Sequence, residues 1–368
     1  MKPMPLAIRR RTLLAGAAAT VLATPLLPRP AIAQGAKIRY TLSWLPTGQY
    51  AYVYMARQLG YWKKRGFEVE ITSGRGSLGA IQAIAGGQFE MGGASTGANL
   101  LSIIKGVDLR IVGTQGYDAS LGVLVPAKGP IKGPKDLEGK TIGVTAAGGD
   151  TPFLPAYFKL AGVDAGKVTQ VSLDSKIIEG AVISGRVDSM VAFGASSIPN
   201  FISADFPVRF LPFAAVGLQF YWVNTLVTSG FLEKNKQLVD DFQDGLFEGM
   251  KFSLLNPEET VERHLKEQEE IAIGKNGKLF TELGVGMVSV CMTAPESRDH
   301  GLGYTDLGKV GEQAKLVKQY TGAATDPDPP LVDHYASNEF IGKVTLSPAE
   351  WEMVKTKTHK YAELLGKA

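Results

Sequence analysis

The fold is decided by residues 37–91, which read KIRYTLSWLPTGQYAYVYMARQLGYWKKRGFEVEITSGRGSLGAIQAIAGGQFEM. Three short runs have the character of strands, and the two runs between them read as helices. The pattern predicts strands at 37–43, 67–71 and from 89 onward, and helices at 50–59 and 77–85. Strands that alternate with helices over short connections are typical of an α/β fold with a parallel sheet.

Trp44 lies just past the first predicted strand, before the break Leu45-Pro46-Thr47-Gly48. In parallel sheets, ligands bind outside the carboxyl ends of the strands. An indole is large for a turn position. The stretch therefore predicts one wall of a small-molecule cleft.

The alternation of strand and helix restarts at Lys140, after a segment rich in glycine and proline at 126–134. A return strand is predicted at 221–227, and the chain beyond it is mostly helical. We therefore predict a first lobe made of 37–125 plus 220–368, with a second lobe, 126–219, inserted into it. Two crossing strands would then hinge a cleft between the lobes.

The first 33 residues have the composition of an export signal. Arg9, Arg10 and Arg11 precede a run rich in alanine, leucine and valine, and Ala31-Ile32-Ala33 offers small residues for cleavage. We predict a twin-arginine-type signal, cleaved near Ala33, that takes the protein through the Tat export machinery to the periplasm. The alternative is a retained N-terminal membrane anchor, which the short apolar run and its prolines disfavour.

The basic charge of the chain belongs to this leader. The 368 residues carry a formal net charge of +3, and residues 1–33 contain five basic residues and no acidic one, which leaves −2 for the rest. Nucleic-acid binding therefore has no support from composition. Cys291 is the only cysteine, so no disulfide within the chain is predicted, and its apolar surroundings predict a buried thiol.

Two glycine-rich turns precede predicted helices. Residues 74–79, GRGSLG, match the dinucleotide fingerprint, but no acidic residue lies between Glu90 and Asp108 to bind a ribose. We interpret this stretch as a tight turn facing the cleft. The turn at 148–151 also opens a helix, whose amides attract acceptors. The Asp150 carboxylate disfavours an anionic ligand there, and a simple N-cap is its alternative role.

Aromatic residues recur where the predicted strands end. Any one of them packs in a core as readily as it binds a ligand, but several that converge suit the stacking of a flat ring. Nearby serine and threonine hydroxyls would bond its polar edges. The predicted ligand-binding residues are Trp44, Tyr50, Ser95, Thr96, Tyr117, Thr145, Gly149, Asp150, Thr151, Phe193 and Tyr221.

The sequence contains no catalytic or metal-binding pattern. His264, His300, His334 and His359 are scattered, mostly in polar helical surroundings, without the pairing that a metal requires. No nucleophile elbow, metal-binding cysteine pair or phosphate-loop lysine is present. We therefore predict a binding protein without metal, cofactor or enzymatic activity.

Several segments resemble the solute-binding proteins of ABC importers, in the subgroup related to the thiamine-pyrimidine precursor synthases. They are WLP at 44–46, GYWKKRGFEV at 60–69, DLEGKTIGV at 136–144, NPEE at 256–259 and SNEF at 337–340. The resemblance implies a type II periplasmic-binding-protein fold, whose two lobes close on a small solute. It also implies an ABC permease and its ATPase as partners. In the pyrimidine-precursor binders of this family, the ring stacks on the tryptophan that matches Trp44.

We therefore expect a monomeric periplasmic binding protein for a small N-heteroaromatic solute similar to a thiamine pyrimidine precursor. A binder of alkanesulfonate, nitrate or another small organic acid is the first alternative. An exported enzyme of the pyrimidine-synthase type is the second, but the cysteine-rich motif of the eukaryotic synthases is missing from this chain.

Overall fold

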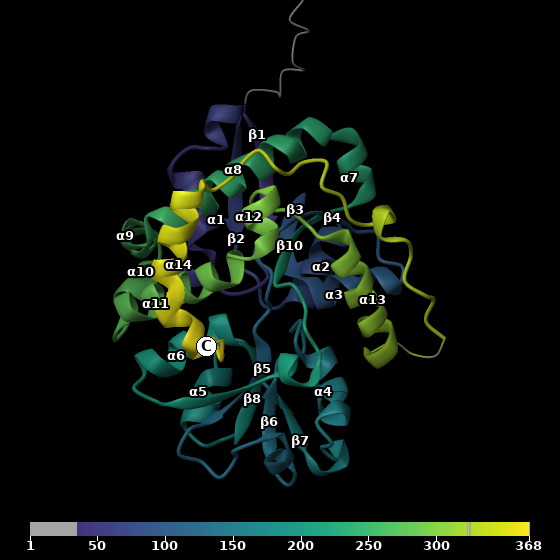
Figure 1. The fold of residues 1–368 in the computed structure, drawn as a ribbon, viewed down its shortest axis with the longest axis vertical. Helices are drawn as coiled ribbons and strands as arrows, with labels where there is room; N and C mark the ends of the chain where they lie inside the picture. Colours follow the sequence, from purple (N-terminus) through teal and green to yellow (C-terminus); the bar gives the residue numbers. More distant parts are fainter. Residues whose placement is uncertain (1–34, 322, 324, 368) are drawn as a thin grey trace, which may run out of the picture. The chain divides into compact units, whose positions relative to one another are not determined.

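The computed structural model describes residues 35–321, 323 and 325–367, so the predicted export signal lies outside the described residues. These residues belong to one unit by their contacts, and their strands form two five-stranded sheets (Figure 1). None of the helices described combines the length and the apolar character that a membrane span needs.

The first sheet has the strand order β2-β1-β3-β10-β4. Strand β1 pairs in parallel with β2 and β3, which confirms the parallel arrangement predicted from residues 37–91. The strands are β1 (Ala36–Thr41), β2 (Phe67–Thr72), β3 (Met91–Ser95), β4 (Arg110–Thr114) and β10 (Val223–Val227).

The second sheet repeats this design with the order β7-β6-β8-β5-β9. Strand β6 pairs in parallel with β7 and β8. The strands are β5 (Leu121–Pro126), β6 (Thr141–Val144), β7 (Thr169–Ser172), β8 (Ser189–Phe193) and β9 (Val208–Pro212). We call the first sheet with its helices the first lobe, and residues 121–212 the second lobe.

The chain crosses between the sheets twice, next to the one reversed strand of each sheet. Four strands of each sheet share a direction, whereas β10 in the first and β5 in the second are antiparallel to both neighbours. The crossing segments pair with each other: Trp222 N donates to Gly116 O (2.9 Å), and Ala119 N donates to Phe220 O (2.9 Å). The two predicted crossings are therefore present and lie side by side.

The predicted lobe boundary at residue 125 is wrong. Strand β5 pairs with β8 and β9 of the second sheet, with Val123 opposite Val191 and Leu211. The glycine- and proline-rich stretch that follows is a loop inside the second lobe rather than the crossing. Glycine and proline mark a turn of the chain, and a turn within a lobe has the same composition as one between lobes.

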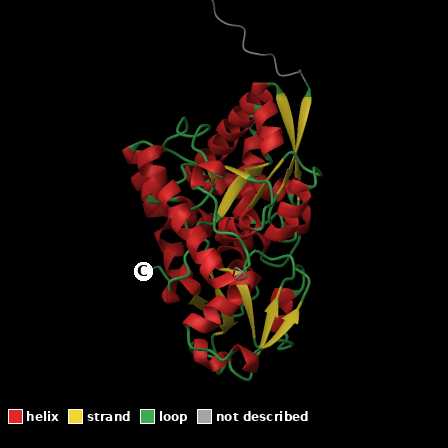
Figure 2. Ribbon diagram, turned by 90° about the vertical axis from the view of Figure 1, so that its right-hand side faces the viewer, coloured by secondary structure: helices red, strands yellow, loops and turns green. Residues whose placement is uncertain are grey.

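Helices cover both sheets (Figure 2). In the first lobe they are α1 (Ala51–Gln58), α2 (Ser77–Ala85), α3 (Thr96–Ile104), α7 (Ser229–Lys234), α8 (Lys236–Leu255), α9 (Pro257–Glu267), α10 (Glu269–Ala272), α11 (Gly277–Met292), α12 (Pro295–His300), α13 (Leu307–Thr321) and α14 (Pro348–Ala362). In the second lobe they are α4 (Leu154–Leu160), α5 (Ile178–Ile183) and α6 (Gly194–Ser203).

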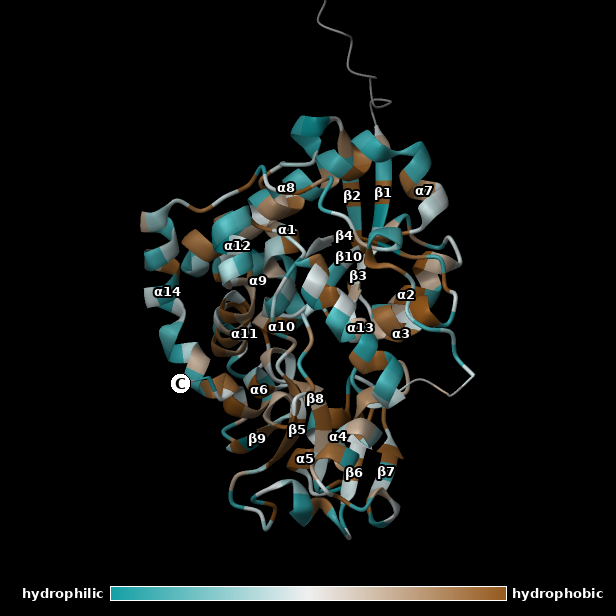
Figure 3. Ribbon diagram, turned by 45° about the vertical axis from the view of Figure 1, so that its right-hand side comes forward, coloured by the Kyte–Doolittle hydropathy of each residue, from teal (hydrophilic) through white to brown (hydrophobic). Residues whose placement is uncertain are grey.

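Helix α11 of the first lobe packs against α6 of the second, as Figure 1 shows between the two sheets. Leu283, Met287 and Cys291 of α11 share one apolar cluster with Ile198 and Phe201 of α6. Cys291 is buried there as predicted. Figure 3 colours the residues by hydropathy: segments of β5, β8 and α3 are hydrophobic, whereas α14 is more hydrophilic.

Candidate functional site: a pocket between the lobes

A narrow pocket lies between the lobes, at the carboxyl ends of β1, β3, β6 and β8. The empty space between its walls is about 470 Å³, which includes space open to solvent. The lining residues are Ser43, Trp44, Tyr50, Gly76, Ser77, Ser95, Thr145, Gly148, Gly149, Asp150, Ile178, Met190, Val191, Ala192, Phe193, Ser196, Ser197, Trp222 and Val223.

The wall from the first lobe is aromatic. Trp44 is partly exposed, while Tyr50 and Trp222 are buried and stack with ring centroids 5.8 Å apart and 24° between their planes. The Tyr50 hydroxyl is 2.5 Å from Ser43 Oγ, which fixes the phenol ring. Rigid π-faces of this kind suit a flat, unsaturated guest, because stacking adds to the burial of apolar area.

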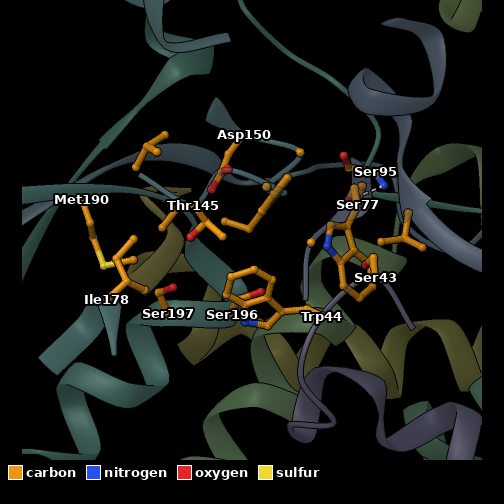
Figure 4. A pocket seen from close by; sticks show the side chains of 18 of the residues that line it. Ser43, Trp44, Ser77, Ser95, Thr145, Asp150, Ile178, Met190, Ser196 and Ser197 are labelled. Atoms are coloured by element: carbon orange, nitrogen blue, oxygen red, sulfur yellow. Dashed lines mark hydrogen bonds between the residues drawn. The ribbon is translucent and has the colours of Figure 1, made fainter. Parts of the chain in front are cut away.

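Ser95 offers a free hydroxyl to the pocket. Its backbone N–H donates to Ser77 Oγ at 3.0 Å, so the two serines are held together beside β3 (Figure 4). Ser95 Oγ itself is buried and has no hydrogen-bond partner among the described residues. A buried polar atom without a partner is costly, so this hydroxyl is available to a ligand that brings one.

Asp150 supplies a buried carboxylate from the second lobe. Its Oδ1 accepts a hydrogen bond from Thr151 N at 2.8 Å, which confirms the predicted N-cap, and the residue is only 7% exposed. Burial raises the pKa of Asp150 to about 6, although the bonds from Thr151 act in the other direction. In Figure 4 the carboxylate and Thr145 lie above the Trp44 ring. Asp150 is therefore both a helix cap and part of the pocket wall.

The charges around the pocket are negative. No lysine or arginine of the described residues lines it. Behind it, Ser197 Oγ donates to Glu179 Oε1 at 2.9 Å. Burial raises the pKa of Glu179, and the charge of Asp150 raises it further. A pocket with a carboxylate and no cation favours a neutral or cationic guest that donates hydrogen bonds.

The lobes touch each other directly around the pocket. Leu78 N donates to the carbonyl of Ala147 at 3.1 Å, and Ser196 Oγ donates to Gln49 Oε1 at 2.6 Å. A Cβ atom on Gly149 would lie 2.3 Å from Ser95 Oγ, so only a glycine fits there. The structure is therefore a closed arrangement of the two lobes.

Two of the glycines that match the dinucleotide fingerprint allow close approaches of the backbone, one within the first lobe and one between the lobes. A Cβ on Gly74 would lie 2.0 Å from the carbonyl oxygen of Leu42, and one on Gly76 would lie 2.1 Å from that of Ala147. Gly76 also has φ +141°, which side chains rarely adopt. The interpretation of this stretch as a tight turn at the cleft is consistent with that geometry.

Seven of the eleven predicted site residues line the pocket: Trp44, Tyr50, Ser95, Thr145, Gly149, Asp150 and Phe193. The structure places the other four elsewhere. Thr96 Oγ1 donates to Asn224 Oδ1 at 2.8 Å inside the first lobe, and Thr151 Oγ1 donates to the carbonyl of Thr145 at 2.9 Å.

The remaining two, Tyr117 and Tyr221, meet edge to face at 5.3 Å on another cavity, where the Tyr221 hydroxyl donates to Glu296 Oε1 at 2.6 Å. Neighbouring residues of an extended segment point to opposite sides. Trp222 therefore faces the pocket and Tyr221 faces away from it. The sequence showed two aromatic residues at 221–222, but it did not show which of the two side chains points into the pocket.

Other lining residues have weaker signals. Ser196 and Ser197 lie in the first turn of α6, which directly follows β8 as α3 directly follows β3 in the first lobe. A helix predicted after 192 would have found them. Ile178 and Met190 resemble ordinary core residues in the sequence, and only the fold brings them to the pocket. Among the residues described, no cluster of side chains could hold a metal ion.

Comparison with known proteins shows which family this chain resembles. The family model described as NMT1/THI5 like matches residues 47–260. The formylaminopyrimidine-binding protein of Halalkalibacterium halodurans is 22% identical over 279 residues, which cover 73% of this chain and 81% of that protein.

Solved structures share the fold at low identity. The alkanesulfonate-binding protein SsuA of Xanthomonas axonopodis pv. citri, bound to MOPS, has a TM-score of 0.64 at 15% identity and covers 83% of this chain and 98% of its own. The periplasmic nitrate-binding protein NrtA of Synechocystis PCC 6803 has a TM-score of 0.60 at 10% identity, and the match covers 90% of this chain and 91% of that one. The type II periplasmic-binding-protein fold predicted from the sequence is thereby confirmed.

Proposed function

The chain belongs to the NMT1/THI5-like family, and from this premise we propose that it is the solute-binding component of an ABC importer. Its ligand is a small N-heteroaromatic solute with hydrogen-bond donors, such as an aminopyrimidine. The observation that carries the proposal is the pocket itself, whose wall includes Trp44 from the first lobe and the buried carboxylate of Asp150 from the second, and which no lysine or arginine of the described residues lines. The likeness to a formylaminopyrimidine-binding protein supports the same class of ligand.

Binding works by closure of the two lobes. The ring lies against Trp44, its donors reach Asp150, and Ser95 Oγ bonds another polar edge. A ligand that contacts both lobes stabilises the closed form by its differential affinity for that form. The permease and its ATPase then recognise the closed protein in the periplasm, after export through the twin-arginine pathway. No bond of the solute is made or broken, and the protein acts as a monomer.

An alkanesulfonate or nitrate, as bound by the structural neighbours, fits this pocket less well. Either anion would be buried beside Asp150 without a compensating lysine or arginine. A thermal-shift screen separates the classes, because a ligand selective for the folded state raises the melting temperature. We expect formylaminopyrimidine to raise it and alkanesulfonates and nitrate to leave it unchanged. The opposite pattern would overturn the proposed ligand class.

Trp44→Ala is expected to weaken binding of formylaminopyrimidine by roughly five- to thirtyfold, because stacking on an aromatic side chain contributes about 1–2 kcal/mol. Isothermal titration calorimetry measures the loss. Tyr61→Ala is the matched control, since Tyr61 is also a partly exposed aromatic of the first lobe but lies outside the pocket. Equal affinities for the wild type and Trp44→Ala would refute the stacking role.

A further inference from the structure

The turn that carries Trp44 is held from behind by a buried histidine. His264 Nε2 lies 3.0 Å from the carbonyl oxygen of Pro46, which is 218 positions away in the sequence. His264 belongs to α9 and is fully buried, although its neighbours in the sequence are mostly polar. It shares the inward face of α9 with Thr260 and Val261, which lie four and three positions before it.

The chemistry of this contact fixes the state of the ring. A carbonyl oxygen only accepts, so Nε2 carries the hydrogen and Nδ1 is an acceptor. Nδ1 is buried and has no partner among the described residues. Burial lowers the pKa of His264 to about 4, so the ring is neutral near pH 7. Tyr54 meets the imidazole edge-on, with ring centroids 5.2 Å apart, and limits its rotation.

The two ends of the turn at 44–47 are held in different ways. On the sheet side, Gly74 N donates to the carbonyl of Trp44 at 3.0 Å, and Gly76 N donates to that of Ser43 at 2.9 Å. On the far side, His264 supplies a side-chain hydrogen bond from another helix to Pro46. Backbone bonds therefore hold the turn at Ser43 and Trp44, and a side-chain bond holds it at Pro46.

We propose that His264 is a positioning residue for the ligand pocket: through Pro46 it fixes the turn at 44–47 and with it the orientation of the Trp44 ring. His264 touches neither the pocket nor its guest. A change at this position is therefore expected to act on ligand affinity only through Trp44. The role in affinity rests on the proposed function, whereas the role in orienting Trp44 is independent of any ligand.

The orientation is tested without ligand by ¹⁹F NMR of protein labelled with 5-fluorotryptophan. The chain has four tryptophans, Trp44, Trp62, Trp222 and Trp351, and single substitutions by phenylalanine assign their resonances. In His264→Leu we expect the Trp44 resonance to shift or broaden while those of Trp62 and Trp351 stay in place. In His264→Gln, whose amide keeps an N–H donor, we expect it to return toward the wild-type position. An unmoved Trp44 resonance, or equal changes at all four, would overturn the proposal.

A double-mutant cycle tests the consequence for binding of formylaminopyrimidine. His264→Leu is expected to reduce affinity roughly three- to tenfold in the wild type, the range of one hydrogen bond. In the Trp44→Ala background the same change should have no further effect. Equal losses in both backgrounds would show that His264 acts on the fold and not on Trp44. If formylaminopyrimidine does not bind at all, the proposed ligand fails, while the NMR result still decides the role of His264.

Discussion

Replacing Asp150 with asparagine is expected to weaken aminopyrimidine binding by tenfold or more and, at the same time, to stabilise the ligand-free protein at pH 7. The loss of binding follows from the carboxylate, since hydrogen bonds to a charged group contribute about 1.5–3 kcal/mol, or roughly 10- to 150-fold in affinity. Asparagine keeps the shape of the side chain and an oxygen that can cap the helix at Thr151.

The gain in stability follows from the buried charge. Burial raises the pKa of Asp150 to about 6 in the folded protein, above the value of about 3.9 in an unfolded chain. The stabilising contribution of this group is therefore fully present below about pH 4 and is lost as the pH rises through 6. At pH 7 the ionised carboxylate costs the folded state on the order of 3 kcal/mol.

Urea denaturation at pH 4 and pH 7 measures this effect. The free energy of unfolding of Asp150→Asn should exceed that of the wild type at pH 7, and the difference should shrink toward pH 4. Asp188→Asn is the matched control. Partial burial tends to raise the pKa of Asp188, but hydrogen bonds from the Thr141 N–H and hydroxyl hold this pKa below its usual value. That variant should lose stability at pH 7. A loss of stability in Asp150→Asn would show that its carboxylate is stabilising.

Gly149→Val is expected to abolish closure and to reduce ligand affinity by more than a hundredfold. A Cβ at this position would lie 2.3 Å from Ser95 Oγ and 2.8 Å from the Cβ of Ser77, on the opposite lobe. The two lobes would be forced apart, so a guest could contact only one of them. Titration calorimetry measures the affinity, and small-angle scattering should give one open profile with and without ligand.

Gly180→Val serves as the control, because a Cβ on Gly180 in α5 of the same lobe has no atom within 4 Å. Its affinity and its scattering change should match the wild type. If Gly149→Val still contracted on addition of formylaminopyrimidine, the contact between Gly149 and Ser95 would not be part of the closed state.

The fold was predictable because its signals are local. Helix α2 occupies 77–85, as predicted, and α1 occupies 51–58, where the pattern predicted 50–59. The boundary at 125 failed for a different reason. Which sheet β5 joins depends on its pairing with β8 and β9, and that pairing is decided by residues far away in the sequence.

The pocket was predictable only in part, for the same physical reason. Trp44 and Asp150 lie in the turns that follow β1 and β6, so their place near the carboxyl ends of the strands could be inferred. Tyr221 and Trp222 differ by one position, and a slip of one residue along an extended chain exchanges its two faces. Strand β10 begins at Val223 and not at 221, and the structure places Trp222 in the pocket.

The apolar contact between α11 and α6 has a consequence for how the molecule holds together. Met287 and Cys291 complete a cluster whose other members include Ile198 and Phe201, so side chains of a first-lobe helix cover part of the interior of the second lobe. We therefore expect the second lobe, if it is cut from the chain at the crossings, to be less stable than in the whole protein, because part of its apolar cluster would then be exposed to water.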